Sequence, residues 1–259
     1  SIFLLFFYIG NQNTKRTIGI NYEVFEYKIP IYLKISDFIN RHYNYKYLVK
    51  EINKNESKEE EIVINTAKWI KKNIKKISIQ EGIDIVDHHP ITIVERRLGI
   101  DEQFSDILSV LLVYSNIESF FKIFNLDFSA AHSLTFFKIN DYWSIIDPYY
   151  GIFFINPKGD FIKIDNLQNN NWEITDLNLK IVDHSNYLNI YKNKFKNFDD
   201  VKIFYNKIFN NLPTTSDIDQ SSIYDLGGRS YIQDPLGRIR FELRKLNIKI
   251  TKKLSLIKF

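Results

Sequence analysis

Three side chains that can support charge-pair or acid-base chemistry stand at the boundaries of predicted elements. Asp101 lies at the start of a predicted helix, His132 on a predicted strand, and Asp147 on the strand that follows. An imidazole between two carboxylates can form a stable charge-paired cluster, take part in hydrolysis, or hold a divalent ion with open coordination positions. These three residues are therefore the candidate site.

The pairing of His132 with Asp147 follows from a predicted hairpin. Residues 132–139 and 142–149 have the pattern of two strands, and the Asn-Asp dipeptide at 140–141 suits a two-residue turn. With the turn centred there, residues whose numbers sum to 281 face each other. His132 and Asp147 then become diagonal neighbours on one face, with roughly 7–8 Å between their backbones across the two strands, within reach of a hydrogen bond between their side chains.

The position of Asp101 follows from a predicted core-facing helix. Gly99 is a predicted turn, and apolar residues recur from there at the spacing i, i+3, i+4, i+7 and i+8. The set consists of Phe104, Ile107, Leu108, Leu111 and Leu112. Asp101 is thus expected at or next to the N-cap, a position that aspartate also favours for purely structural reasons.

This order of a helix-start residue, a strand histidine and an aspartate on the next strand resembles the Cys-His-Asp triad of transglutaminase-like domains, which have the papain-like thiol-enzyme fold. The resemblance runs from about Glu59 to Asn156. It rests on four segments: Thr66-Ala67-Lys68-Trp69-Ile70, Arg96-Arg97-Leu98-Gly99-Ile100-Asp101-Glu102-Gln103-Phe104-Ser105, Ala131-His132-Ser133, and Trp143-Ser144-Ile145-Ile146-Asp147-Pro148.

The resemblance implies that position 101 is the nucleophile position, His132 the base and Asp147 the group that orients it. The family has cysteine where this chain has Asp101, and a carboxylate at a helix N-terminus is stabilised as an anion and attacks amides poorly. Ser105 lies one turn into the helix, and Ser133 is expected on the strand face opposite to His132, so neither obviously replaces the thiol. Acyl transfer by the family mechanism should be lost.

The composition agrees with that expectation. The chain of 259 residues contains no cysteine, which excludes disulfides, thiolate metal sites and thiol catalysis for this sequence. Its 44% hydrophobic and 25% charged residues are those of an ordinary globular protein.

The predicted fold class is α+β, with a central helix packed on an antiparallel sheet. Residues 1–55 form an aromatic-rich lead-in ending in a helix, 56–157 the transglutaminase-like core, and 158–259 a C-terminal extension with a basic tail. Within these regions the sequence predicts a helix of about 18 residues begun by a Ser57-x-x-Glu60 capping box. It also predicts strands at 153–155 and 161–164, a turn at 157–159 and a helix near 199–210.

The two ends of the chain suggest contacts with surfaces. Residues 2–9 are all hydrophobic. We interpret this segment in one of two ways: as the end of a longer signal or membrane anchor, or as a buried strand or docking segment. From Gly237 onward, eight Lys and Arg residues stand against Glu242 alone. This basic tail is either a solvated face or a contact for anionic lipid, polysaccharide or nucleic acid.

The leading interpretation is a degenerate transglutaminase-like protein that binds a peptide or glycan in the old substrate cleft or serves as a scaffold, without cofactor, metal or specific nucleic acid. The resemblance implies a bacterial type, often met in cell-surface or polysaccharide contexts; the sequence leaves the compartment open between a membrane-anchored or envelope location and the cytoplasm.

The alternative is an active hydrolase or acyltransferase using Asp101, His132 and Asp147, with or without a divalent metal, to which His88 and His89 could add a ligand. A third reading is an adaptor that acts through the basic tail. An open groove ending at His132 would favour an enzyme or binder, whereas a groove filled by Phe104 or Tyr149 would favour a purely structural role.

Overall fold

The structure is a computed structural model of the chain and combines helices with antiparallel sheet, as the predicted α+β class requires. It describes residues 2–20, 23–54, 56–77, 89–127, 130–169, 171–221, 223 and 225–229. The helices are α1 (Ile2–Gly10), α2 (Ile31–Asn53), α3 (Glu59–Asn73), α4 (Pro90–Arg96), α5 (Asp101–Tyr114), α6 (Ile164–Leu167), α7 (Tyr187–Tyr191), α8 (Phe198–Phe209) and α9 (Thr215–Gln220). The strands are β1 (Asn13–Ile20), β2 (Glu23–Pro30), β3 (Lys75–Lys76), β4 (Leu98–Gly99), β5 (Ser119–Asp127), β6 (Ala130–Ile139), β7 (Tyr142–Asp147), β8 (Ile152–Ile155), β9 (Glu173–Asp176) and β10 (Gly228–Arg229).

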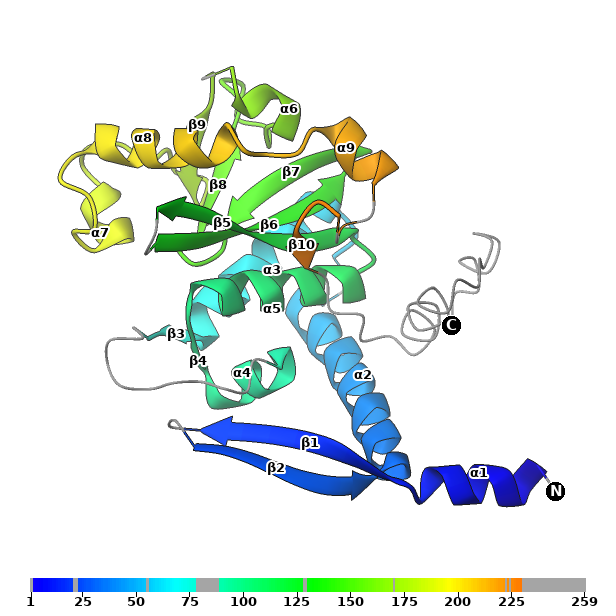
Figure 1. Cartoon of the computed structure of the whole chain (residues 1–259). Helices are drawn as coiled ribbons and strands as arrows, with labels where there is room; N and C mark the ends of the chain where they lie inside the picture. Colours follow the sequence, from blue (N-terminus) through cyan, green and yellow to red (C-terminus); the bar gives the residue numbers. More distant parts are fainter. Residues whose placement is uncertain are drawn as a thin grey trace.

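A six-stranded antiparallel sheet of order β10-β5-β6-β7-β8-β9 lies between two helical layers (Figure 1). Helices α3 and α5 cover one face, and α8 lies across the other. Phe136 and Phe137 show why both faces need cover, because these neighbours on β6 point to opposite sides and enter different hydrophobic clusters.

Helix α5 is the central helix that the sequence predicts. All residues from Gln103 to Leu112 are buried, including the five apolar residues of the predicted core-facing set. A helix buried on every side needs apolar or hydrogen-bonded residues all round. Ser109 meets this need, because its hydroxyl donates to the carbonyl of Asp106 at 2.8 Å, whereas Oδ1 of the buried Asp106 has no hydrogen-bond partner among the described residues.

The predicted hairpin is confirmed in register and in turn. The β6–β7 pairs run from Thr135↔Ile146 to Ile139↔Tyr142, each summing to the expected value. Positive φ angles at both turn residues, 46° at position 140 and 63° at position 141, give the backbone twist that suits a two-residue hairpin.

Some local predictions were wrong. The Ser57 capping box is not formed: α3 begins at Glu59 after Lys58, because the Glu56 carboxylate accepts the N–H groups of both Ser57 and Lys58. Residues 161–164 contribute a single β-bridge at Phe161 and then enter α6 rather than forming a strand. Strand β8, the turn at 157–159 and helix α8 are as expected.

The boundary predicted at residue 157 does not coincide with a break in packing. Strand β9 pairs with β8, and α6 and α8 share one hydrophobic cluster with strands β5 to β8. The described part of the expected extension is therefore built onto the same sheet, because the face of the sheet opposite α5 would otherwise expose residues such as Leu134 and Phe154.

The lead-in contains more than helix. The hairpin β1–β2 precedes α2, and α1 carries apolar side chains that are mostly exposed, such as Phe3 and Phe6. None of the helices in the described ranges is long and apolar enough to cross a membrane. The basic tail from Gly237 lies outside the described residues.

Candidate functional site

Asp101 is the first residue of α5, next to the N-cap Ile100. Its carboxylate points away from its own helix toward strand β6, where Oδ1 accepts the backbone N–H of Ser133 at 2.7 Å and also the Ser133 hydroxyl. The β6–β7 ladder begins at Thr135, so the N–H of Ser133 is not used in that ladder and is available to Asp101. The end of the ladder thus creates the position that the carboxylate occupies.

His132 lies between Asp101 and Asp147. Its Nδ1 is 2.6 Å from Asp101 Oδ2, and its Nε2 is 2.5 Å from Asp147 Oδ2. The imidazole is 2% exposed and Asp147 is fully buried, whereas Asp101 keeps 26% of its side chain in contact with solvent. The structure therefore brings together all three residues that the sequence singles out.

Asp147 is held by three donors. Besides His132, the Tyr150 backbone N–H donates to Oδ1 at 2.9 Å and the Tyr205 hydroxyl donates to Oδ2 at 2.7 Å. A buried carboxylate without such partners would be strongly destabilised, so these contacts fix both its charge and its orientation.

The electrostatics make His132 a cation. Burial by itself lowers the pKa of His132, but the negative charges and hydrogen bonds of Asp101 and Asp147 outweigh burial and raise that pKa to about 10. Burial raises the pKa of Asp147, but the charge of His132 and the hydrogen bonds from His132, Tyr150 and Tyr205 bring it below its ordinary value. Each imidazole nitrogen carries a proton and donates to a carboxylate.

Aromatic rings enclose the imidazole. The ring centroids of Tyr150, Phe204 and Tyr205 lie 5.6, 5.1 and 6.4 Å from that of His132. Phe204 and Tyr205 belong to α8, so the layer on the far side of the sheet contributes directly to the site. This wall excludes water from one side of the ion cluster.

On the other side, the cluster opens into a cleft of about 730 Å³. The lining residues are Ile77, Ile100, Asp101, Glu102, Ile123, Ala131, His132, Ser133, Tyr149, Tyr150 and Lys194. The volume lies within the range of ordinary ligand sites. Phe104 does not fill the cleft, because it is buried beneath Tyr149 and meets that ring edge-on, with ring centroids 5.4 Å apart.

Several residues of this neighbourhood were not identified from the sequence. Ser133 was expected to face away from His132 and to take no part in the site. Its hydroxyl nevertheless contacts Asp101, because Asp101 lies at the edge of β6 and binds Ser133 through Oδ1 and His132 through Oδ2. Tyr205 carries no local signal, because it is 58 residues from Asp147 in the sequence. Lys76 and Lys194 belong to segments that have no recognisable motif.

The geometry does not provide a metal site at His132. Both imidazole nitrogens face carboxylates, which leaves no free lone pair for an ion. Among the residues that the structure describes, no group of three or more His, Asp and Glu side chains is arranged to hold a metal. His89 caps α4, its Nδ1 accepting the N–H of Ile91 at 3.4 Å, and His88 lies outside the described residues.

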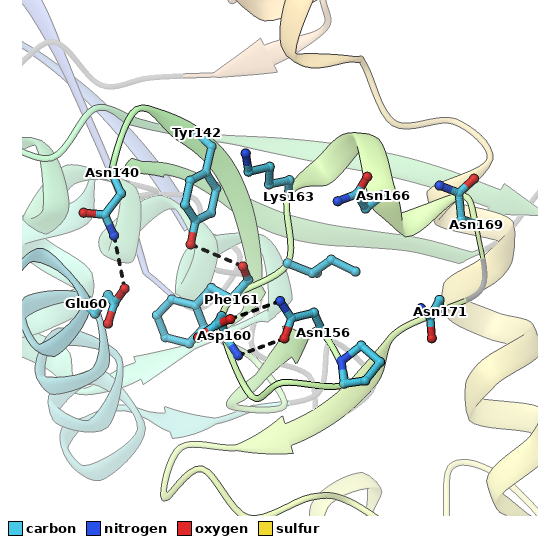
Figure 2. Close-up of a pocket in the computed structure, with 12 residues that line it drawn as sticks. Glu60, Asn140, Tyr142, Asn156, Asp160, Phe161, Lys163, Asn166, Asn169 and Asn171 are labelled. Atoms are coloured by element: carbon cyan, nitrogen blue, oxygen red, sulfur yellow. Dashed lines mark hydrogen bonds between the residues drawn. The ribbon is translucent and has the colours of Figure 1, made fainter.

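A second hollow, of about 560 Å³, lies between the start of α3, the β6–β7 turn and the loops on either side of α6 (Figure 2). Several of its polar groups are paired with one another, as the Asn156 amide bonds to Asp160 and the Asn140 amide to Glu60. Lys163 places its ammonium 5.3 Å from the centre of the Tyr142 ring. None of the three candidate site residues lines this hollow.

No family model and no curated protein matches the chain. Among solved structures, the chain is similar to a "putative protease" from Parabacteroides distasonis, with 11% sequence identity and a TM-score of 0.35 over 67% of this chain. The aligned part spans 40% of the length of that protein.

Proposed function

We propose that the chain is a transglutaminase-like protein that lacks acyl-transfer activity and binds a peptide or glycan in the cleft beside His132. The observation that carries this proposal is an open cleft that ends at Asp101, His132 and Asp147, with a carboxylate at the position where the resemblance places a nucleophilic thiol.

The order of elements supports the resemblance. Asp101 begins a buried helix that packs on an antiparallel sheet, His132 lies on a strand of that sheet, and Asp147 ends the next strand. The two carboxylates contact different nitrogens of the ring, so position 101 and the orienting aspartate are on opposite sides of the imidazole. This arrangement is what a nucleophile, base and orienter would need.

The hydrogen bonds argue against chemistry in the present chain. Both oxygens of Asp101 are engaged, Oδ1 with Ser133 and Oδ2 with His132, and the protonated imidazole has no lone pair with which to accept a proton. A nucleophile needs an exposed electron pair, and a general base needs an unprotonated nitrogen. The cluster is suited to holding the end of the cleft rigid rather than to attacking a carbonyl group.

Restoring the thiol tests the proposal. Acyl transfer and amide hydrolysis should be measured on a panel of glutamine-donor peptides for the parent chain, for Asp101→Cys and for Glu102→Cys. We expect no turnover by the parent, a gain for Asp101→Cys, and none for Glu102→Cys, which places a thiol in the same cleft without the contact to His132. Turnover by the parent that His132→Gln abolishes would contradict the proposal and favour the hydrolase alternative.

A further inference from the structure

Two lysines surround the tyrosine wall of the cleft. The Lys76 ammonium, at the end of β3, lies 4.3 Å from the centre of the Tyr149 ring and 4.9 Å from that of Tyr150. The Lys194 ammonium lies 5.1 Å from the Tyr150 centre and 4.5 Å from that of Phe204. Both distances to Tyr150 are within the range of cation–π contacts, so each ammonium group contacts the same ring of the cleft wall.

Among the described residues, these two lysines have no carboxylate in direct contact, although their charges are balanced at longer range by the site cluster, in which one imidazolium stands against two carboxylates, and by Glu102 in the cleft lining. Within the described ranges, neither Lys76 nor Lys194 forms an ion pair with a carboxylate. Asp101 and Asp147 are close enough to influence both lysines, but each already contacts His132. The Lys194 ammonium, which lines the cleft, thus remains available as a direct partner for a ligand, and Lys76 lies behind the tyrosine rings, next to the lining residue Ile77.

Lys76 is held in a partly desolvated position. Its side chain is half-buried, and burial lowers its pKa to about 8 against the opposing effect of Asp147. A cation that has lost part of its hydration gains more from a nearby anion than one fully in water. Tyr149 and Tyr150 hold the two ammonium groups in place before any ligand arrives, which reduces the ordering cost of binding.

The rest of the lining indicates the kind of molecule. Ile77, Ile100, Ile123 and Ala131 supply an apolar surface, and the polar groups of the site cluster are largely engaged with one another. Glu102 adds a carboxylate to the lining beside Asp101, so an anionic ligand group is favoured at Lys194 rather than at the start of α5. A sugar would leave many hydroxyl groups without partners on such a surface. A peptide offers apolar side chains for the isoleucines and a carboxylate for the lysines.

We propose, on the basis of the binding function above, that the cleft binds an acidic peptide whose side-chain carboxylate lies beside Tyr150, where it contacts the Lys194 ammonium and is attracted at longer range by the charge of Lys76. The site cluster forms the end of the cleft, and the lysines select the anionic residue. Specificity then comes from charge at the tyrosine wall rather than from the Asp101 position.

The test compares two isosteric probes on the full chain. One is a fluorescein-labelled peptide of alternating Glu and Ile, and the other has Gln in place of every Glu. Fluorescence anisotropy at 20 mM and 300 mM NaCl gives the affinities. We expect the Glu peptide to bind about tenfold more tightly at low salt, and the preference to shrink at high salt because exposed charges are screened within about 8–10 Å near physiological ionic strength.

Two variants locate the preference. Lys76→Met together with Lys194→Met keeps long stems against the tyrosine rings but removes both charges, and it should reduce the affinity for the Glu peptide to that for the Gln peptide. Lys163→Met is the matched control, because Lys163 also lies over a tyrosine ring, Tyr142, but in the other hollow (Figure 2). Thermal unfolding of each variant establishes that it is folded.

The outcomes separate the two proposals. If the Gln peptide binds as tightly as the Glu peptide, or if the double variant keeps the preference, the acidic-peptide inference is wrong while peptide binding stands. If neither peptide binds, the inference and peptide binding in this cleft both fail. Lysine-dependent binding of polygalacturonate in the absence of peptide binding would overturn the peptide assignment and point to an acidic glycan.

Discussion

The hydroxyl of Tyr205 donates to Asp147 Oδ2 at 2.7 Å and so connects helix α8 to the carboxylate that orients His132. The two residues come from opposite sides of the predicted boundary at residue 157. Because Asp147 is fully buried, each of its hydrogen bonds replaces water that cannot reach it. The described C-terminal part of the chain is therefore needed for the site itself.

Tyr205→Phe should destabilise the fold through this contact. The change removes one donor from a buried carboxylate, and hydrogen bonds to charged groups are worth about 1.5–3 kcal/mol. It also removes the acceptor of the Tyr191 hydroxyl, a longer contact of 3.4 Å. The matched control is Tyr187→Phe, which removes a hydroxyl that donates to the Lys196 carbonyl at 3.0 Å, a neutral bond worth about 0.5–1.5 kcal/mol. Urea unfolding of both variants gives the comparison, and an equal cost would show that Asp147 does not depend on Tyr205.

The charge state of His132 is a second prediction. With its pKa raised to about 10 by the two carboxylates, the imidazole should remain protonated across neutral pH. Nitrogen-15 NMR of histidine-labelled protein, with the His132 signal assigned by its loss in His132→Gln, should show no titration between pH 5 and 8. A midpoint near the ordinary value of about 6.5 would contradict the ion cluster.

The stability of the fold should follow these pKa shifts. The His132 pKa is higher in the folded chain than in the unfolded chain, so its stabilisation is fully present below about pH 6.5 and is lost as the pH rises through about 10. The Asp147 pKa is lowered on folding, so its contribution is present above about pH 3.9 and is lost as the pH falls through the folded value. Thermal midpoints should therefore be highest between about pH 4 and 6.5, and this dependence should weaken in His132→Gln.

Local sequence signals predicted the parts of the site that depend on neighbours along the chain. The hairpin register follows from a two-residue turn and from strand alternation, and the start of α5 follows from apolar spacing after Gly99. These suffice to bring His132 and Asp147 together, and the resemblance adds Asp101. Such features are set by backbone periodicity and need no knowledge of the tertiary fold.

The remaining parts depend on packing between distant segments. Tyr205 reaches Asp147 because α8 covers the sheet, and Lys76 reaches Tyr149 because β3 pairs with β4 immediately before α5. No periodicity in one segment encodes which other segment lies against it. The predicted Ser57 capping box was wrong for a local reason of the same kind. The Glu56 carboxylate accepts the N–H groups of Ser57 and Lys58, so the Ser57 N–H is not left for Glu60.

Removing the charge of Asp101 should lower the pKa of His132 while leaving the chain folded. In Asp101→Asn, the side-chain oxygen can still accept the Ser133 N–H, but one of the two negative charges beside the imidazole is lost. The pKa of His132 should fall from about 10. Because Asp101 is 26% exposed, the cost in stability should stay near 1–2 kcal/mol.

The comparison variant is Asp147→Asn, which makes the same charge change in a fully buried position. There the protonated imidazole and the Tyr205 hydroxyl lose a common anionic acceptor, and breaking a buried ion pair costs about 3–5 kcal/mol. NMR titration and urea unfolding of both variants test the difference. A His132 pKa unchanged by Asp101→Asn would show that Asp147 alone sets its charge.

The loop after Asp147 depends on glycine at position 151. Gly151 has φ +68°, and a Cβ there would lie 2.7 Å from Lys71 Cδ. Lys71 donates to the Tyr150 carbonyl at 3.1 Å, so moving its side chain would also break that contact beside the site. Gly151→Ala should therefore cost about 1–2 kcal/mol for the left-handed backbone, and about 0.5–1.5 kcal/mol more if moving the flexible end of Lys71 breaks its hydrogen bond to Tyr150.

Gly227→Ala isolates the backbone part of that cost. Gly227 has nearly the same φ, +70°, but nothing lies within 4 Å of its added Cβ. The excess loss of Gly151→Ala over Gly227→Ala in urea unfolding measures the displacement of Lys71, and it should disappear when both substitutions are repeated in a Lys71→Ala background. An excess that persists without Lys71 would mean that strain at Gly151 arises from the backbone of the Asp147 loop and not from the lysine above it.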